Sequence, residues 1–203
     1  MATVARAVRL ISQATKWSET DLRHRARWLI EAGRLPKGKG GFGGAGAAEV
    51  TITDLVTLIL SMAVPVAKAT PDHIETFRNL RGEDEIGKFW RLEYALTNRI
   101  EFCGDRARVV DAETTVLSLR LFFDEKYPEA EIIWHDKKDP PKVDHSLKFA
   151  REGHESEPDR PDLVDCKRGV FFGGNIFFVL WDILTEEKPA PKKKARRRRG
   201  TAK

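Results

Sequence analysis

Residues 33–40, GRLPKGKG, carry the glycines and lysines of a nucleotide-binding loop. They match the pattern GxxxxGK, but Gly40 stands where a Ser or Thr hydroxyl would bind Mg²⁺. The octet also follows a predicted helix, whereas the loop of an NTP site follows a buried strand. We therefore interpret Arg34, Lys37 and Lys39 as contacts to nucleic-acid phosphates, which a glycine-rich backbone can approach closely. An exposed loop without a ligand is the alternative.

The helix predicted before this loop carries a second set of basic residues. Ser18 can cap its N-terminus, Asp21 follows as in a capping box, and Gly33 supplies a left-handed stop at its C-terminus. Its polar face, at spacings of three and four, consists of Thr20, Arg23, His24 and Arg27. Because arginine is the usual contact to guanine in the major groove, this face is predicted to contact DNA bases. Arg25 is interpreted as a further phosphate or packing contact, and a solvated arginine face is the alternative.

The end of the chain is a polycation. Residues 188–203 contain nine Lys or Arg, no Asp or Glu and almost no apolar side chains. This composition predicts a disordered tail that adds affinity for nucleic acid by counterion release, without sequence preference. Its candidate contacts are Lys192, Lys193, Lys194, Arg196, Arg197, Arg198 and Arg199. Binding to RNA, or to the acidic middle of the chain, is the alternative for this tail.

Charge is divided unevenly along the chain. Residues 1–68 hold ten Lys or Arg against five Asp or Glu, whereas residues 69–187 hold seventeen against twenty-six. A basic head and a basic tail favour a polyanionic partner. The acidic middle argues against a protein that coats nucleic acid with its whole surface.

The spacing of apolar residues predicts three helices in the first 65 residues. The first covers residues 3–14, the second lies between Ser18 and Gly33, and the third begins at Thr51 or Thr53 and ends before Pro65. Two helices, a glycine-rich loop and a third helix form the outline of a winged helix-turn-helix domain.

The rest of the chain is predicted to be mixed α/β after a linker at residues 66–72. The expected elements are helices at 72–80 and 85–97, strands at 99–103, 106–111, 114–123 and 130–135, a mobile loop at 136–165, a strand at 169–172 and an amphipathic helix at 175–186.

Several function classes find no support in the residue pattern. The histidines and the two cysteines show neither HxxxH nor CxxC spacing, so no metal site is predicted and Cys103 and Cys166 are interpreted as reduced. No nucleophile stands in a catalytic pattern, so neither an enzyme nor a cofactor is predicted. No run approaches the roughly 18 apolar residues of a membrane span and no secretory signal is evident. We expect a cytoplasmic protein without a membrane partner.

The stretch DLRHRARWLIEAGRLPKGKGG resembles winged helix-turn-helix regulators of the MerR-like and phage types, and some phage terminase small subunits. In that pattern the second helix ends in an xxGxLP turn that leads into the wing. The resemblance covers about the first third of the chain. It implies that the polar face around Arg23 and Arg27 contacts the DNA groove, and that Lys37 and Lys39 lie in the wing.

The sequence therefore predicts an α+β protein. A winged helix-turn-helix domain is expected at residues 1–65, an acidic α/β domain at 73–187 and a disordered basic tail at 188–203. The function expected is that of a sequence-specific, dimeric transcriptional regulator of phage or mobile-element type, which binds double-stranded DNA at the nucleoid and dimerises through residues 73–187. The alternative is a DNA-packaging or assembly adaptor, similar to a terminase small subunit, that docks other proteins through the acidic domain.

Overall fold

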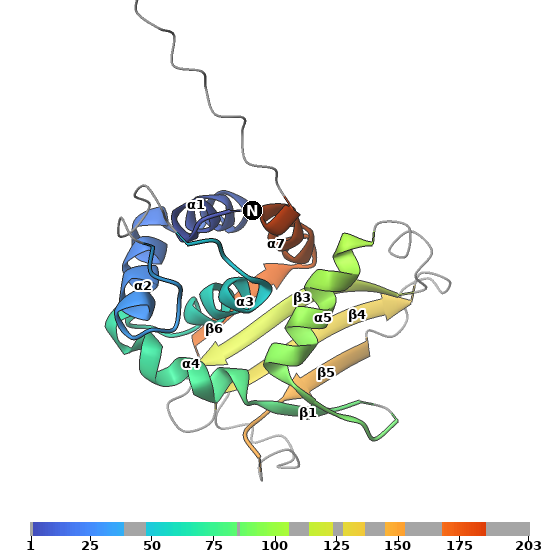
Figure 1. Cartoon of the computed structure of the whole chain (residues 1–203). Coiled ribbons are helices and arrows are strands. Elements are labelled where there is room, and N and C mark those ends of the chain that lie inside the picture. Colours follow the sequence, from blue (N-terminus) through green and yellow to red (C-terminus); the bar gives the residue numbers. More distant parts are fainter. Residues whose placement is uncertain are drawn as a thin grey trace, which may run out of the picture.

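Helices cover one face of a four-stranded antiparallel sheet, which gives the chain an α+β fold (Figure 1). The computed structural model describes residues 2–38, 48–84, 86–105, 114–123, 128–136, 145–152 and 168–185. The sheet consists, in spatial order, of β5 (His145–Phe149), β4 (Glu129–Asp136), β3 (Thr114–Phe123) and β6 (Arg168–Gly173).

The first three helices each begin at a hydroxyl side chain that accepts a main-chain N–H. The caps are Thr3 for α1 (Val4–Thr15), Ser18 for α2 (Glu19–Glu31) and Thr51 for α3 (Ile52–Ser61). The three predicted helices are thus confirmed, and Thr51 rather than Thr53 caps the third. Every residue of α3 from Leu55 to Ser61 is buried, so this helix forms the centre of the helical layer (Figure 1).

A 3₁₀ turn, a helix and a hairpin connect α3 to α5 (Leu92–Gly104), the helix that lies across the sheet. The turn is η1 (Ala67–Ala69), the helix is α4 (Thr70–Arg78), and the hairpin consists of β1 (Arg81–Glu83) and β2 (Phe89–Arg91). The linker expected at residues 66–72 is instead η1 and the first turn of α4, and Thr70 is fully buried. The helix predicted at 72–80 corresponds to α4.

One apolar core runs through the molecule, from Ala2 to Ile183. The N-terminal helix α1 packs on the last described helix, α7 (Asn175–Thr185), and α3 packs on both α5 and α7. The boundary expected between residues 1–65 and 73–187 therefore does not divide the core. The apolar stripe of α1 forms one part of this core, and the apolar face of α7 forms another part.

Two local predictions in the middle of the chain are wrong. A helix is expected to begin at residue 85, but residues 86–91 belong to the β1–β2 hairpin, where Asp84 accepts the main-chain N–H of Ile86 and of Lys88 and Gly87 has a φ of 79°. Residues 99–103, expected as a strand, are the last turns of α5. The apolar spacing explains this, because α5 buries Leu92, Ala95, Leu96, Ile100 and Cys103 at helical intervals.

The predicted strands at 114–123, 130–135 and 169–172 are confirmed as β3, β4 and β6. In β3 and β4, the paired Leu119 and Ile132 are buried, whereas the next pair, Arg120 and Glu131, forms an ion pair of 3.2 Å on the other face. The loop predicted at 136–165 contains β5, whose Leu147 and Phe149 are buried. Residues 137–144 and 153–165 of that loop, and the strand expected at 106–111, lie outside the described residues.

The predicted helix at 175–186 is confirmed as α7, which follows β6 after a short turn. Of the helices in the described ranges, none combines the length and the apolar character needed to cross a membrane.

Candidate functional site

The exposed face predicted on α2 is set up by a short turn between α1 and α2. Lys16 has a left-handed backbone, with φ 60°, which ends α1, and the Ser18 hydroxyl accepts the main-chain N–H of Asp21 to begin α2. The Asp21 carboxylate does not complete a capping box. It accepts hydrogen bonds from Trp17 Nε1 and from Arg25 Nε, both at 2.7 Å.

The inner face of α2 is held by both apolar and polar contacts. Leu22, Ala26 and Leu29 are fully buried. Arg25 is only 1% exposed, and its Nη1 donates to the main-chain oxygens of Ser61 and Val64 at 2.5 and 2.6 Å. Arg25 is therefore a packing residue, and its predicted alternative as a phosphate contact is wrong because its donors are used inside the protein.

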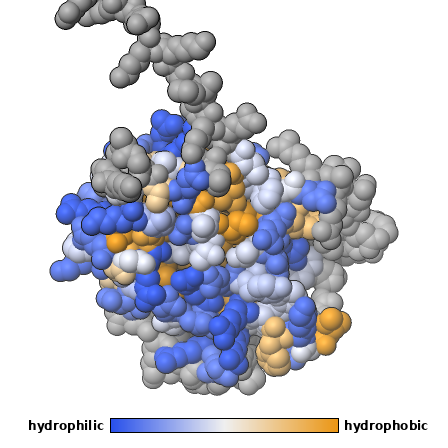
Figure 2. Space-filling model, in the orientation of Figure 1, coloured by the Kyte–Doolittle hydropathy of each residue, from blue (hydrophilic) through white to orange (hydrophobic). Residues whose placement is uncertain are grey.

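The outer face of α2 presents its polar side chains to solvent. The exposed set is Thr20, Arg23, His24 and Arg27. Both arginines of this set pair with glutamates on the same helix, Arg23 with Glu19 at 2.5 Å and Arg27 with Glu31 at 2.8 Å. The hydrogen bond to Glu31 raises the pKa of Arg27. The side chains at the left of Figure 2, where α2 lies, are largely hydrophilic.

The basic residues after α2 leave the helix at a glycine. Gly33 has a φ of 71°, and the main-chain N–H of Arg34 donates to Leu29. The Arg34 side chain pairs with Glu75 of α4 at 2.7 Å, and Lys37 is exposed. The loop returns to the start of α1, where Val50 N–H donates to the Ala2 oxygen. Lys39, the glycines at 40–46 and every predicted contact in the tail, residues 192–199, lie outside the described residues.

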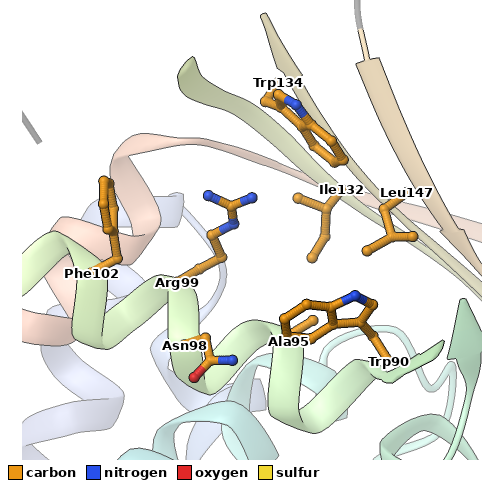
Figure 3. Close-up of a pocket in the computed structure, with 8 residues that line it drawn as sticks. All are labelled: Trp90, Ala95, Asn98, Arg99, Phe102, Ile132, Trp134 and Leu147. Carbon is orange, nitrogen blue, oxygen red and sulfur yellow. The ribbon is translucent and has the colours of Figure 1, made fainter. Parts of the chain in front are cut away.

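A pocket of about 200 Å³ lies between α5 and the inner face of the sheet (Figure 3). Its principal lining residues are Trp90, Asn98, Arg99, Phe102, Ile132 and Trp134. In Figure 3, Arg99 rises from α5 toward Ile132 and Trp134, and Trp90 stands at the other end, above Ala95. Trp90 is fixed by a hydrogen bond from its Nε1 to Asp84, at 2.8 Å, and by stacking on Tyr94.

The charge in this pocket comes from one arginine. The guanidinium of Arg99 lies over the Trp134 ring, 5.6 Å from its centroid, and within the described part of the chain no carboxylate forms an ion pair with it. Burial lowers the pKa of Arg99 and raises the pKa of the neighbouring Cys103 thiol to about 11. The pocket thus combines aromatic walls with a cation that pairs with no carboxylate among the described residues.

The two regions differ in how far the sequence predicts them. The structure brings the predicted residues of α2 onto one exposed face, with Arg34 and Lys37 beyond its C-terminus. The sequence does not predict the pocket, because the pattern of residues 99–103 indicates a strand. If residues 92–104 are taken as a helix, Arg99 lies beside Ala95 and Phe102. A charged residue among apolar neighbours on one helix face is the sequence signal that could indicate the pocket.

No grouping of His, Cys, Asp and Glu suited to holding a metal ion occurs among the residues that the structure describes. Comparisons of the chain with protein-family models, curated proteins and solved structures find no significant match. The resemblance to winged helix-turn-helix regulators stays a prediction.

Proposed function

We propose that this protein binds double-stranded DNA through the outer face of α2. In this proposal α2 is the second helix of an N-terminal winged helix-turn-helix domain. One observation supports this proposal most directly. A single exposed stripe, which starts in the first turn of α2, consists of Thr20, Arg23, His24 and Arg27. Two helices joined by three residues, with the second exposing its N-terminal side chains, suit insertion into a major groove.

The ion pairs on this face are compatible with binding. Arg23 and Arg27 are 57% and 73% exposed, and solvent-exposed ion pairs of this kind contribute little to stability. A phosphate or a guanine edge can replace Glu19 or Glu31 as the acceptor at little cost. The same carboxylates repel phosphates, so they lower affinity in a way that can be measured.

Further cations surround the face on the same part of the molecule. Lys16 is exposed at the turn before α2, and Lys37 is exposed after it. We assign these residues, with Arg34, Lys39 and the basic residues of the tail, to phosphate contacts that position the protein without specifying sequence. Glu75, the present partner of Arg34, would then be exchanged for a phosphate.

The proposal includes a dimer that binds paired half-sites through residues 73–187, and regulation of transcription as the outcome. A packaging or assembly adaptor would use the same DNA face. The two are separated by light scattering of the protein–DNA complex, since a regulator gives a dimer and a packaging adaptor gives a larger ring.

The test uses the full chain and a preferred duplex selected from random sequence. Arg23→Ala with Arg27→Ala should weaken binding to that duplex by roughly 1–3 kcal/mol per lost base contact and reduce the preference over random DNA. Glu19→Gln with Glu31→Gln should strengthen binding to both. Arg120→Ala is the matched control, because Arg120 also pairs with a glutamate but lies on the sheet.

The outcomes separate base contacts from general electrostatics. Removing residues 188–203 should lower affinity for every sequence and flatten the dependence on salt, while leaving the preference intact. If the Arg23/Arg27 double variant binds the selected duplex as the Arg120 variant does, α2 is not the DNA interface and the proposal fails.

A further inference from the structure

The pocket between α5 and the sheet has features of a ligand site that the proposed DNA interface does not use. It lies on α5, β2 and β4, whereas the DNA face is on α2. Trp90, Phe102 and Trp134 supply aromatic walls from three different elements, and Leu147 of β5 adds an aliphatic surface. Aromatic walls with a few polar groups at fixed positions are the usual composition of small-molecule sites.

Arg99 determines the charge of the ligand that this pocket would accept. A guanidinium that is partly withdrawn from water, and that pairs with no carboxylate in the described ranges, is unfavourable for folding, as the lowered pKa of Arg99 reflects. An anion placed beside it restores a charge-assisted pair, which a planar carboxylate can form with two parallel hydrogen bonds. The Asn98 side chain, also at the pocket, offers both a donor and an acceptor.

The volume limits the size of that anion. The pocket holds about 200 Å³, and cavities of about 150 Å³ accommodate one benzene ring. Drug-sized ligands and nucleotides occupy pockets of about 300–1,000 Å³. A single aromatic ring that carries a carboxylate fits the volume, the walls and the charge together.

We propose that this pocket binds a single-ring aromatic carboxylate. The ring lies between Trp90 and Trp134, and the carboxylate pairs with the guanidinium of Arg99. The hydrogen bond from Trp90 to Asp84 and the stacking of Tyr94 hold the wall formed by β2 in position before the ligand arrives. This site is independent of the DNA proposal, because none of its residues belongs to α2.

The test measures binding of benzoate to the full-length protein by calorimetry, in the absence of DNA. Benzamide and benzyl alcohol keep the ring without the charge, and acetate keeps the carboxylate without the ring. We expect saturable binding of benzoate, and binding at least about tenfold weaker for the other three, since one charge-assisted hydrogen bond corresponds to about a tenfold change or more.

Variants then assign the charge to one residue. Arg99→Met should weaken benzoate binding by about tenfold or more and remove the difference between benzoate and benzamide. Arg99→Lys, which keeps the charge but not the planar fork, should lie between the two. Arg120→Met is the control, because Arg120 also lies over an aromatic ring, that of Phe171 at 5.9 Å, but outside the pocket. It should leave benzoate binding unchanged.

Four results would overturn the proposal. They are equal affinities for benzoate and benzamide, equal affinities for benzoate and acetate, full benzoate affinity in a folded Arg99→Met variant, and no saturable binding of any probe. Near-ultraviolet circular dichroism shows whether each variant keeps its packed aromatic residues. Trp134→Leu, which shortens one wall and keeps Arg99, should weaken benzoate and benzamide alike, and a loss confined to benzoate would contradict the assigned geometry.

Discussion

Arg25 donates a hydrogen bond from Nη1 to the main-chain oxygen of Ser61, 2.5 Å away, although the two residues stand thirty-six positions apart. Ser61 is the last residue of α3, where carbonyl groups have no partner within the helix. The same guanidinium bonds to the oxygen of Val64 and to Asp21. One buried side chain of α2 thus satisfies the end of α3 and fixes which face of α2 remains outside.

Replacing Arg25 by alanine should lower the free energy of unfolding by about 1–3 kcal/mol, the range for leaving buried hydrogen-bonding groups without their partner. The substitution leaves Asp21 without its Arg25 bond and the Ser61 oxygen without that donor. Urea denaturation measures the effect. Arg23→Ala is the control on the same helix, and it should change the free energy of unfolding by less than about 1 kcal/mol because its ion pair is exposed. Similar losses in the two variants would contradict the structural role of Arg25.

Gly82→Ala should destabilise the hairpin that carries Trp90. A Cβ on Gly82 would overlap the main-chain oxygen of Lys148 and meet Phe149 Cδ1 at 3.0 Å, so β1 would have to move away from β5. Overpacking of this kind costs about 1–3 kcal/mol, which thermal unfolding can measure. Gly87→Ala is a useful comparison at the tip of the same hairpin, where the strain comes from its φ of 79° and not from contact with β5. Only the Gly82 variant should also alter benzoate binding.

The sequence predicts the helices of the N-terminal part because local signals agree there. Ser18 and Thr51 cap helices whose apolar residues recur at intervals of three and four, and Gly33 adopts the left-handed conformation expected of it. The middle of the chain was harder to predict. In residues 99–103 the alternation of Ile100 and Phe102 with polar residues imitates a strand, and only the longer apolar stripe from Leu92 indicates a helix.

Local sequence patterns do not predict which distant residues pack against one another. Nothing in the sequence around Arg25 distinguishes a phosphate contact from a residue that bonds to Ser61, because the partner belongs to another helix. The pocket has the same origin, since Trp90, Arg99 and Trp134 come together only when α5 lies on β4. Prolines and small residues predict a linker at 66–72, but Thr70 lies in the core that joins both halves.

The Cys103 thiol should be unreactive in the folded protein at pH 8. Its side chain is 8% exposed, and burial raises its pKa to about 11 from an ordinary value of 9.0, although the charge of Arg99 acts in the opposite direction. In a Cys166→Ser background, a thiol reagent should therefore modify Cys103 slowly until urea unfolds the chain. Rapid modification of the folded protein would show that the thiol is accessible or ionised.

The same shift predicts how stability depends on pH. Between about pH 9 and 11 the folded state retains the Cys103 proton that the unfolded state releases, so rising pH favours unfolding. Relative to a Cys103→Val variant, the wild-type chain should lose stability across this interval and show no relative change below it. Urea denaturation at a series of pH values gives the comparison, and the titration of lysines and tyrosines cancels between the two chains. A flat difference from pH 8 to 11 would contradict the raised pKa.

Arg99→Met should raise the free energy of unfolding, by about 1 kcal/mol, since replacing a poorly compensated buried charge with an apolar side chain of similar length is often stabilising. Urea denaturation without ligand tests this, with Arg120→Met as the control, which removes an ion pair on the sheet and should not stabilise. Benzoate should then reverse the order. At a concentration near 100 times its dissociation constant it should stabilise the wild-type chain by about 2.7 kcal/mol, and the Arg99 variant far less. A variant that is less stable than wild type without ligand would show that Arg99 supports the fold, and the cost attributed to burying its charge would be wrong.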